Sequence, residues 1–185
     1  VDPANPYELT DEELHVITQL TDSFRHSEKL QAHTRYLYSK GGLYKVINGN
    51  LLFHGCIPMN ADGTLKEVYL HDGLYKGRAL LDKVDSLIRA AHSADTDEAL
   101  RQFSVDYLWY LWCGKDAPTF DKDRMATFER YFLKDKAVMK ETKGHYYTLR
   151  NEDSTVDLLL SEFGVEGDHR HIINGHIPVK TLKGE

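Results

Sequence analysis

Apolar residues recur three or four positions apart in two stretches of the chain, which is the spacing of a helix with one buried face. The first stretch follows Thr10 and Glu13, which match a capping box that satisfies the first free amides of a helix. It runs to the glycines at 41 and 42 and predicts one long helix, or two with a break near Ser23. The second stretch predicts an amphipathic helix from Gly77 to His92.

Three further helices are predicted, and one of them is rich in aromatic residues. This helix covers residues 96–112, and its aromatic content is too dense for a solvent-exposed face. We therefore expect it to be deeply packed or to contact another part of the protein. Residues 123–133 and 154–163 predict the two shorter helices, and the glycine and proline within 113–118 predict a loop.

Short apolar runs bounded by turn residues predict the strands. Asn48-Gly49 favours a type I′ turn and predicts a hairpin between residues 43–47 and 50–53. Further strands are predicted at 66–70, at 146–149 and at the start of 171–178. Helices and strands together predict a mixed α/β fold.

Two of these strands end in a histidine beside a glycine. His54-Gly55 follows the hairpin, and Gly175-His176 follows the strand near the end of the chain. Glycine lets the backbone turn sharply and lets a ligand or a metal ion approach closely. Each histidine taken alone could simply cap its strand. Because the pattern occurs twice, the sequence supports equally the interpretation that both histidines belong to one shared site. The two positions are so far apart in sequence that the sheet must assemble any such site.

Two neutral imidazoles suit Mn²⁺, Fe²⁺ or Zn²⁺. A catalytic pair of metal ions also needs bridging carboxylates, and the chain has no Asp-x-His, GDxxDxG or GNHE motif before His54. His169 and His171 form a rival HxH pair, because alternate strand residues share a face. Residues 168–171 are all polar, which favours an exposed loop instead. The chain also lacks GxSxG, Walker, HExxH, zinc-ribbon and dinucleotide motifs.

Length and charge narrow the classes of function. The 185 residues suit one domain or part of a larger one, and both ends resemble cuts in a longer polypeptide. No apolar run approaches the roughly 18 residues of a membrane span. The net charge of −6 disfavours nucleic acid and anionic membranes as partners, so we expect a soluble, cytoplasmic protein. Its two cysteines predict no disulfide framework, and Cys56 fits a small buried hydrophobe better than a thiolate ligand or nucleophile.

Six segments, taken in order, resemble the C-terminal portion of class III fructose-1,6-bisphosphatases, the large bacterial type within the calcineurin-like metallophosphoesterase superfamily. They are FRHSEKL (24–30), LYSKG (37–41), NGNLLFHGCIP (48–58), YLWYLWCG (107–114), TFERYF (127–132) and HIINGHIPVK (171–180). Each segment is weak alone, but the ordered set spans nearly the whole chain.

The resemblance implies that residues 1–185 are a single partial domain of a calcineurin-like metallophosphatase sandwich, with 77–150 as a large helix-rich insertion. It implies that His54 and His176 bind the second of two metal ions, expected to be Mn²⁺, and that the catalytic residues lie upstream of this chain. The intact enzyme would hydrolyse the 1-phosphate of fructose 1,6-bisphosphate to give fructose 6-phosphate, a step of gluconeogenesis. Lys180, Lys183 and Arg78 could hold the distal phosphate.

Two alternatives stay open beside this hypothesis. The two histidines indicate metal binding but say nothing about which sugar or other group carries the phosphate. The chain could therefore belong to a related two-metal phosphoesterase acting on another phosphate ester. It could also be a non-catalytic assembly fragment whose aromatic helix forms an interface. Because a cut sheet exposes strand edges and apolar surface, we expect the chain to form homo-oligomers or to pack against the missing N-terminal portion of the same protein.

Overall fold

The computed structural model describes residues 4–5 and 7–177 of the 185-residue chain. The chain forms two compact units, Val1–Gly41 and Gly42–Glu185. Among the described residues, no helix is both long enough and apolar enough to cross a membrane.

The N-terminal unit contains two helices, α1 (Asp11–Arg25) and α2 (Glu28–Lys40). The predicted capping box at the start of α1 is present. The Thr10 hydroxyl accepts a hydrogen bond from the Glu13 amide, and the Glu13 carboxylate accepts one from the Thr10 amide. The break between the helices falls a few residues beyond Ser23, because the Ser27 side chain accepts the Leu30 amide and starts a new helix.

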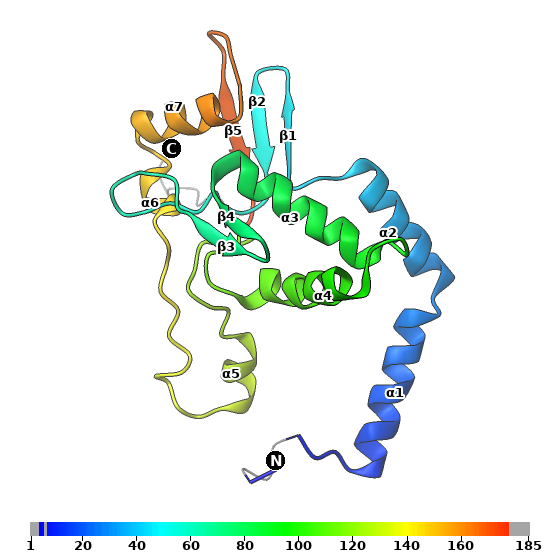
Figure 1. The fold of residues 1–185 in the computed structure, drawn as a ribbon. Coiled ribbons are helices and arrows are strands. Elements are labelled where there is room, and N and C mark those ends of the chain that lie inside the picture. Colours follow the sequence, from blue (N-terminus) through cyan, green and yellow to red (C-terminus); the bar gives the residue numbers. More distant parts are fainter. Residues whose placement is uncertain (1–3, 6, 178–185) are drawn as a thin grey trace, which may run out of the picture. The chain divides into compact units, whose positions relative to one another are not determined.

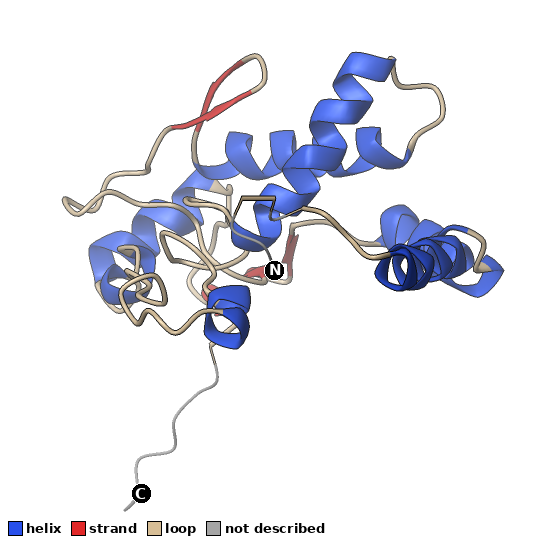
Figure 2. Ribbon diagram, turned by 90° about the horizontal axis from the view of Figure 1, so that it is seen from below, coloured by secondary structure: helices blue, strands red, loops and turns tan. Residues whose placement is uncertain are grey.

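The C-terminal unit is mixed α/β, as the sequence predicts. Its helices are α3 (Gly77–His92), α4 (Glu98–Cys113), α5 (Thr127–Phe132), α6 (Tyr146–Leu149) and α7 (Asp153–Glu162). Its strands are β1 (Tyr44–Ile47), β2 (Asn50–Phe53), β3 (Val68–Leu70), β4 (Gly73–Tyr75) and β5 (His171–Asn174). Figure 2 shows the strands as short segments among helices and loops. The partial-domain boundary and the insertion at 77–150 stay predictions.

A three-stranded sheet in the order β1-β2-β5 positions the candidate site. β1 and β2 form the predicted hairpin, and Asn48 and Gly49 have φ values of 50° and 73°, as a type I′ turn requires. β5 pairs with β2 in parallel, with Phe53 opposite Asn174. Two segments far apart in sequence therefore run side by side and end at the same edge of the sheet (Figure 1).

Two hydrophobic clusters form the core of this unit. The first covers one face of the sheet, where β2 packs against the α7 region through Leu51, Phe53, Leu159, Leu160 and Phe163. The second lies between α3 and α4, which run close together in Figure 1, and includes Leu80, Val84, Leu87, Tyr107 and Leu111. Leu81 of α3 belongs to the first cluster, so α3 contacts both.

The opposite face of the sheet carries apolar side chains that remain exposed. Side chains alternate between the two faces of a strand, so Ile47 and Ile173 lie on the face that Leu51 and Phe53 do not use. Ile47 is 48% exposed and Ile173 is 53% exposed. This face therefore lacks the cover that the first cluster gives the other one.

The strand predicted at Tyr146–Leu149 is wrong, because these residues form the short helix α6. The Leu149 amide donates to the His145 carbonyl at 3.0 Å, and the Tyr147 amide donates to the Asp121 carboxylate at 3.0 Å. Tyr146 is buried, so one helical turn explains the apolar pattern that suggested alternation.

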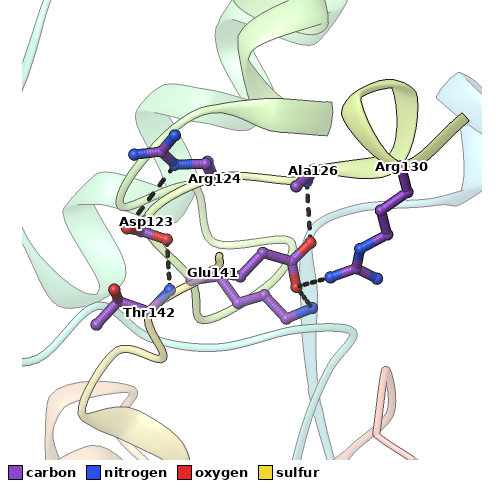
Figure 3. A network of polar contacts seen from close by, with 7 residues as sticks. Asp123, Arg124, Ala126, Arg130, Glu141 and Thr142 are labelled. Carbon is purple, nitrogen blue, oxygen red and sulfur yellow. Dashed lines mark hydrogen bonds and ion pairs between the residues drawn. The ribbon is translucent and has the colours of Figure 1, made fainter. Parts of the chain in front are cut away.

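The helix predicted at 123–133 is shorter than expected, since α5 begins at Thr127. Asp123 is held instead by the loop at Thr142: its amide donates to the Thr142 carbonyl at 2.9 Å, and its carboxylate accepts the Thr142 amide at 2.7 Å. Figure 3 shows this contact beside Glu141. The strand predicted at 66–70 is shortened to β3, and its partner β4 was not predicted.

The aromatic helix α4 is packed on one side only. Tyr107 and Leu111 are buried, whereas Trp109 is 60% exposed and Trp112 is 43% exposed. The expectation of deep packing therefore holds for the side that faces α3, and the tryptophan side remains open.

Candidate functional site

The two histidines singled out by the repeated pattern lie together at one edge of the sheet. His54 follows β2 directly, and His176 lies two residues after β5. Their ring centres are 5.4 Å apart, and the ring planes meet at 83°. The Gly175 amide donates to the His54 carbonyl at 2.9 Å, which ties the two strand ends to each other. The expectation that these strands lie close in space is confirmed.

His176 sits in an unusual backbone conformation. Its φ is 63°, in the left-handed region that few non-glycine residues occupy. The Ile177 amide donates to the Gly175 carbonyl at 2.7 Å, which closes a three-residue γ-turn around the histidine. Backbone strain of this kind concentrates at functional sites. The turn ends the strand and leaves the His176 ring against that of His54.

Gly55 is required by a close approach of two loops. A Cβ at this position would lie 2.4 Å from the Thr119 backbone carbonyl and 2.5 Å from the Pro118 carbonyl oxygen. The Cys56 amide donates to the same Pro118 carbonyl at 2.9 Å, and the Tyr147 hydroxyl donates to the Gly55 carbonyl at 3.0 Å. The glycine therefore lets protein backbone approach here, and these contacts fix the position of the chain after His54.

The histidines open onto a pocket of about 400 Å³ whose other walls are mainly apolar, including Trp112, Phe120 and Met125. Partial burial lowers the pKa of His176, and the neighbouring His54 and Lys122 lower it further. The neutral form of His176 is therefore favoured, and neutral imidazole is the form that binds metal ions.

The separation of the two rings fits a shared metal ion. Two imidazoles that bind one ion through bonds of about 2.0–2.1 Å, as for Zn²⁺, have ring centres roughly 5 Å apart. Within the described ranges, no group of three or more histidine, cysteine, aspartate or glutamate residues could hold a metal ion. The pair can therefore supply two ligands, and a complete site needs others from outside the described residues.

The predicted phosphate-binding residues are not assembled at this pocket. Arg78 is the second residue of α3, where its guanidinium donates to the Tyr44 hydroxyl at 3.1 Å and lies 3.7 Å from Asp82. It is not among the residues that line the pocket beside the histidines. Lys180 and Lys183 lie outside the described residues, so the role of all three toward a substrate stays a prediction.

The rival HxH pair lies at the other end of the sheet. His171 begins β5, opposite Asn50 at the start of β2, and its amide donates to the Gly49 carbonyl at 3.0 Å. His169 and His171 are both exposed. The parallel register therefore separates this pair from the edge where His54 and His176 meet.

Cys56 is a buried hydrophobic residue, as the sequence predicts. It is 2% exposed, and its thiol lies 3.6 Å from the Ala117 carbonyl that it can donate to. Burial raises the pKa of the Cys56 thiol well above its usual value, which disfavours the thiolate.

A second pocket, of about 350 Å³, adjoins the first, and Phe120 lines both. It is lined by four lysines, Lys66, Lys115, Lys122 and Lys143, which come from three separate segments of the chain. No local sequence pattern marks this cluster, because its members are scattered along the chain and each resembles an ordinary surface lysine.

Comparison with known proteins identifies the class to which this chain belongs. Residues 1–185 match the Firmicute fructose-1,6-bisphosphatase family throughout, and the chain is a member of that family. Proteins named fructose-1,6-bisphosphatase class 3 are 62% identical in Phocaeicola vulgatus, 57% in Bacteroides fragilis and 51% in Clostridium botulinum. Each match covers 100% of this chain but 28% of the relative, so the chain spans little more than a quarter of their length. No solved structure matches the chain significantly.

Proposed function

We propose that the full-length protein carrying this chain is a fructose-1,6-bisphosphatase, which converts fructose 1,6-bisphosphate to fructose 6-phosphate and phosphate. The observation that carries the proposal is the match of the entire chain, at 62% identity, to a relative named fructose-1,6-bisphosphatase class 3. This activity would place the protein in gluconeogenesis and in the cytoplasm. Since the chain spans 28% of that relative, it supplies only part of the active site.

His54 and His176 are the part of the metal site that this chain contributes. Metal ions bound there, which we propose to be Mn²⁺, would lower the pKa of coordinated water and neutralise charge on phosphoryl oxygens. The chain itself holds two imidazoles close together: contacts around Gly55 fix one, and the turn at residues 175–177 fixes the other. The two fixed imidazoles and the family match support our proposal that the complete fold is a calcineurin-like metallophosphatase sandwich.

The remaining ligands and the catalytic residues would come from the rest of the polypeptide. The exposed apolar face of the sheet, which includes Ile47 and Ile173, supports this arrangement. Covering apolar surface of this kind stabilises a protein by about 25 cal/mol per Å². We propose that the missing portion of the same protein covers this face, and that the whole protein forms homo-oligomers.

Phosphate release by the full-length protein tests the proposal. Fructose 1,6-bisphosphate should be hydrolysed faster than a nucleoside monophosphate or a phosphopeptide at equal concentration, with Mn²⁺ present. Faster hydrolysis of either competitor would show that the protein is a related phosphoesterase with a different substrate. No hydrolysis of any of the three would refute the enzymatic proposal.

One observation favours a second role in assembly. Trp109, Trp112 and Phe128 form an exposed aromatic cluster, with ring centres 5.3 Å apart between the tryptophans and 5.5 Å between Trp112 and Phe128. Exposed aromatic groups of this kind are typical of protein interfaces. Replacing Trp109 and Phe128 by serine should reduce the oligomer size measured by light scattering if this cluster is an interface, and an unchanged size would exclude it.

A further inference from the structure

The lysine-lined pocket combines positive charge with a buried carboxylate. Three aspartates, Asp116, Asp121 and Asp123, line it together with the four lysines, and so does Phe120, which also lines the histidine pocket. The walls come from three parts of the chain: residues 56–66, 115–123 and 142–145. A volume of about 350 Å³ is sufficient for a small polar metabolite.

Two of the four lysines are neutralised by the protein itself. The Lys66 ammonium is 2.7 Å from the Asp116 carboxylate, and the Lys122 ammonium is 2.7 Å from the Glu141 carboxylate. Glu141 also accepts the Ala126 amide at 2.9 Å, and Arg130 lies 3.3 Å from it (Figure 3). This network holds Lys122 and its loop in place.

The other two lysines, Lys115 and Lys143, keep their charge available. Neither ammonium makes an ion pair or hydrogen bond with any residue that the structure describes. Both are exposed and line the same pocket from different loops. Two unpaired ammonium groups facing one cavity are suited to a phosphate monoester, which accepts several charge-assisted hydrogen bonds.

Asp121 supplies the complementary chemistry. It is 8% exposed, and its Oδ2 atom accepts the Tyr147 amide at 3.0 Å. A Cβ at position 144 would lie 1.9 Å from its Oδ1 atom, so glycine at 144 makes room for the carboxyl group. Each carboxylate oxygen can accept more than one hydrogen bond, so Asp121 can also accept from hydroxyl groups of a ligand.

The pocket is also next to the histidine pair. Phe120 lines both cavities, and its ring centre lies 6.5 Å from that of His176. A ligand in the lysine pocket would therefore occupy the neighbourhood of the proposed metal site.

We propose that this pocket binds a phosphorylated sugar, with Lys115 and Lys143 holding the phosphate and Asp121 accepting the sugar hydroxyls. If the ligand is the fructose 6-phosphate half of the substrate, the inference rests on the proposed function. The same chemistry would also recognise a separate sugar phosphate that regulates the enzyme.

The test measures the binding of fructose 6-phosphate to the full-length protein by isothermal titration calorimetry. The double variant Lys115→Met, Lys143→Met should bind fructose 6-phosphate at least tenfold more weakly. The matched control Lys134→Met, Lys140→Met removes two exposed lysines that do not line the pocket, and its affinity should stay within twofold of wild type. Asp121→Asn should weaken fructose 6-phosphate more than inorganic phosphate. Unchanged affinity in the pocket variant, or no binding of fructose 6-phosphate to wild type, overturns the proposal.

Two further measurements separate the source of the ligand and the dependence on the proposed function. A raised KM for fructose 1,6-bisphosphate in the pocket variant assigns the pocket to the substrate, whereas an unchanged KM with an altered response to added fructose 6-phosphate assigns it to regulation. The variant His54→Ala, His176→Ala should lose hydrolysis and still bind fructose 6-phosphate. If hydrolysis is absent from wild type but fructose 6-phosphate binds through the lysines, the proposed function fails and the pocket stands.

Discussion

Replacing Gly55 by alanine should loosen the loop contact that positions His54. The added Cβ would lie 2.4 Å from the Thr119 carbonyl group and 2.5 Å from the Pro118 oxygen, and all of these atoms belong to the backbone. A rotamer change cannot relieve the overlap, so one loop must move. The movement would stretch the 2.9 Å hydrogen bond from the Cys56 amide to the Pro118 carbonyl.

The magnitude follows from two contributions. Overpacking costs roughly 1–3 kcal/mol, and loss of one internal hydrogen bond costs about 1 kcal/mol. We therefore expect local destabilisation of about 2–4 kcal/mol, which corresponds to roughly 30-fold to 900-fold faster exchange of the amides that this local opening exposes.

Amide hydrogen exchange of the full-length protein, measured by mass spectrometry over residues 54–58, gives the required local readout. The control is Gly73→Ala, where the nearest atom to an added Cβ is a Tyr75 ring carbon at 3.6 Å, an ordinary contact. Its exchange over residues 54–58 should match wild type. Wild-type exchange in Gly55→Ala would refute the close approach, and with it the explanation of how His54 is held.

Three further outcomes are expected from buried or paired groups. Glu141→Gln removes the partner of the half-buried Lys122, and should reduce the free energy of unfolding by about 2 kcal/mol in urea denaturation at neutral pH; no change would show that the pair is solvated. Burial raises the pKa of Asp121, so the stability gained from its protonated form is present below about pH 4 and is lost as the pH rises through the folded pKa. The stability of Asp121→Asn relative to wild type should therefore increase from about pH 4 to pH 7, and a flat difference would contradict this sign. Iodoacetamide should label Cys113 well before the buried Cys56, as mass spectrometry of the native protein would show, and equal rates would contradict the burial of Cys56.

The elements with strong local signals were predictable from the sequence. The Asn48-Gly49 turn requires positive φ at both positions, and few sequences other than such a dipeptide satisfy it. The helix Gly77–His92 has one apolar face over its full length, and its predicted bounds agree with the structure. The strand-end histidines were found for the same reason, because each is marked by a neighbouring glycine.

Features that depend on distant contacts were not predictable. Tyr146–Leu149 resembles a strand until the Asp121 carboxylate, from another loop, is found at the Tyr147 amide. The lysine pocket has no local signature either, since ordinary loop lysines become a cluster only when the loops meet. The sequence pattern at Gly55 predicts a sharp turn and room for a ligand or a metal ion, whereas the atoms that approach it belong to the backbone at Pro118 and Thr119.

Mn²⁺ binding to the full-length protein tests the central claim most directly. Electron paramagnetic resonance measures the concentration of free Mn²⁺ during a titration. It should show at least one tight site in the wild-type protein that is lost in the double variant His54→Ala, His176→Ala. The matched variant His169→Ala, His171→Ala removes two imidazoles from the other end of the sheet and should keep that site. Loss in the first variant alone would place a metal on the histidine pair. Wild-type Mn²⁺ binding in the first variant would contradict the account and leave the two histidines with a structural role.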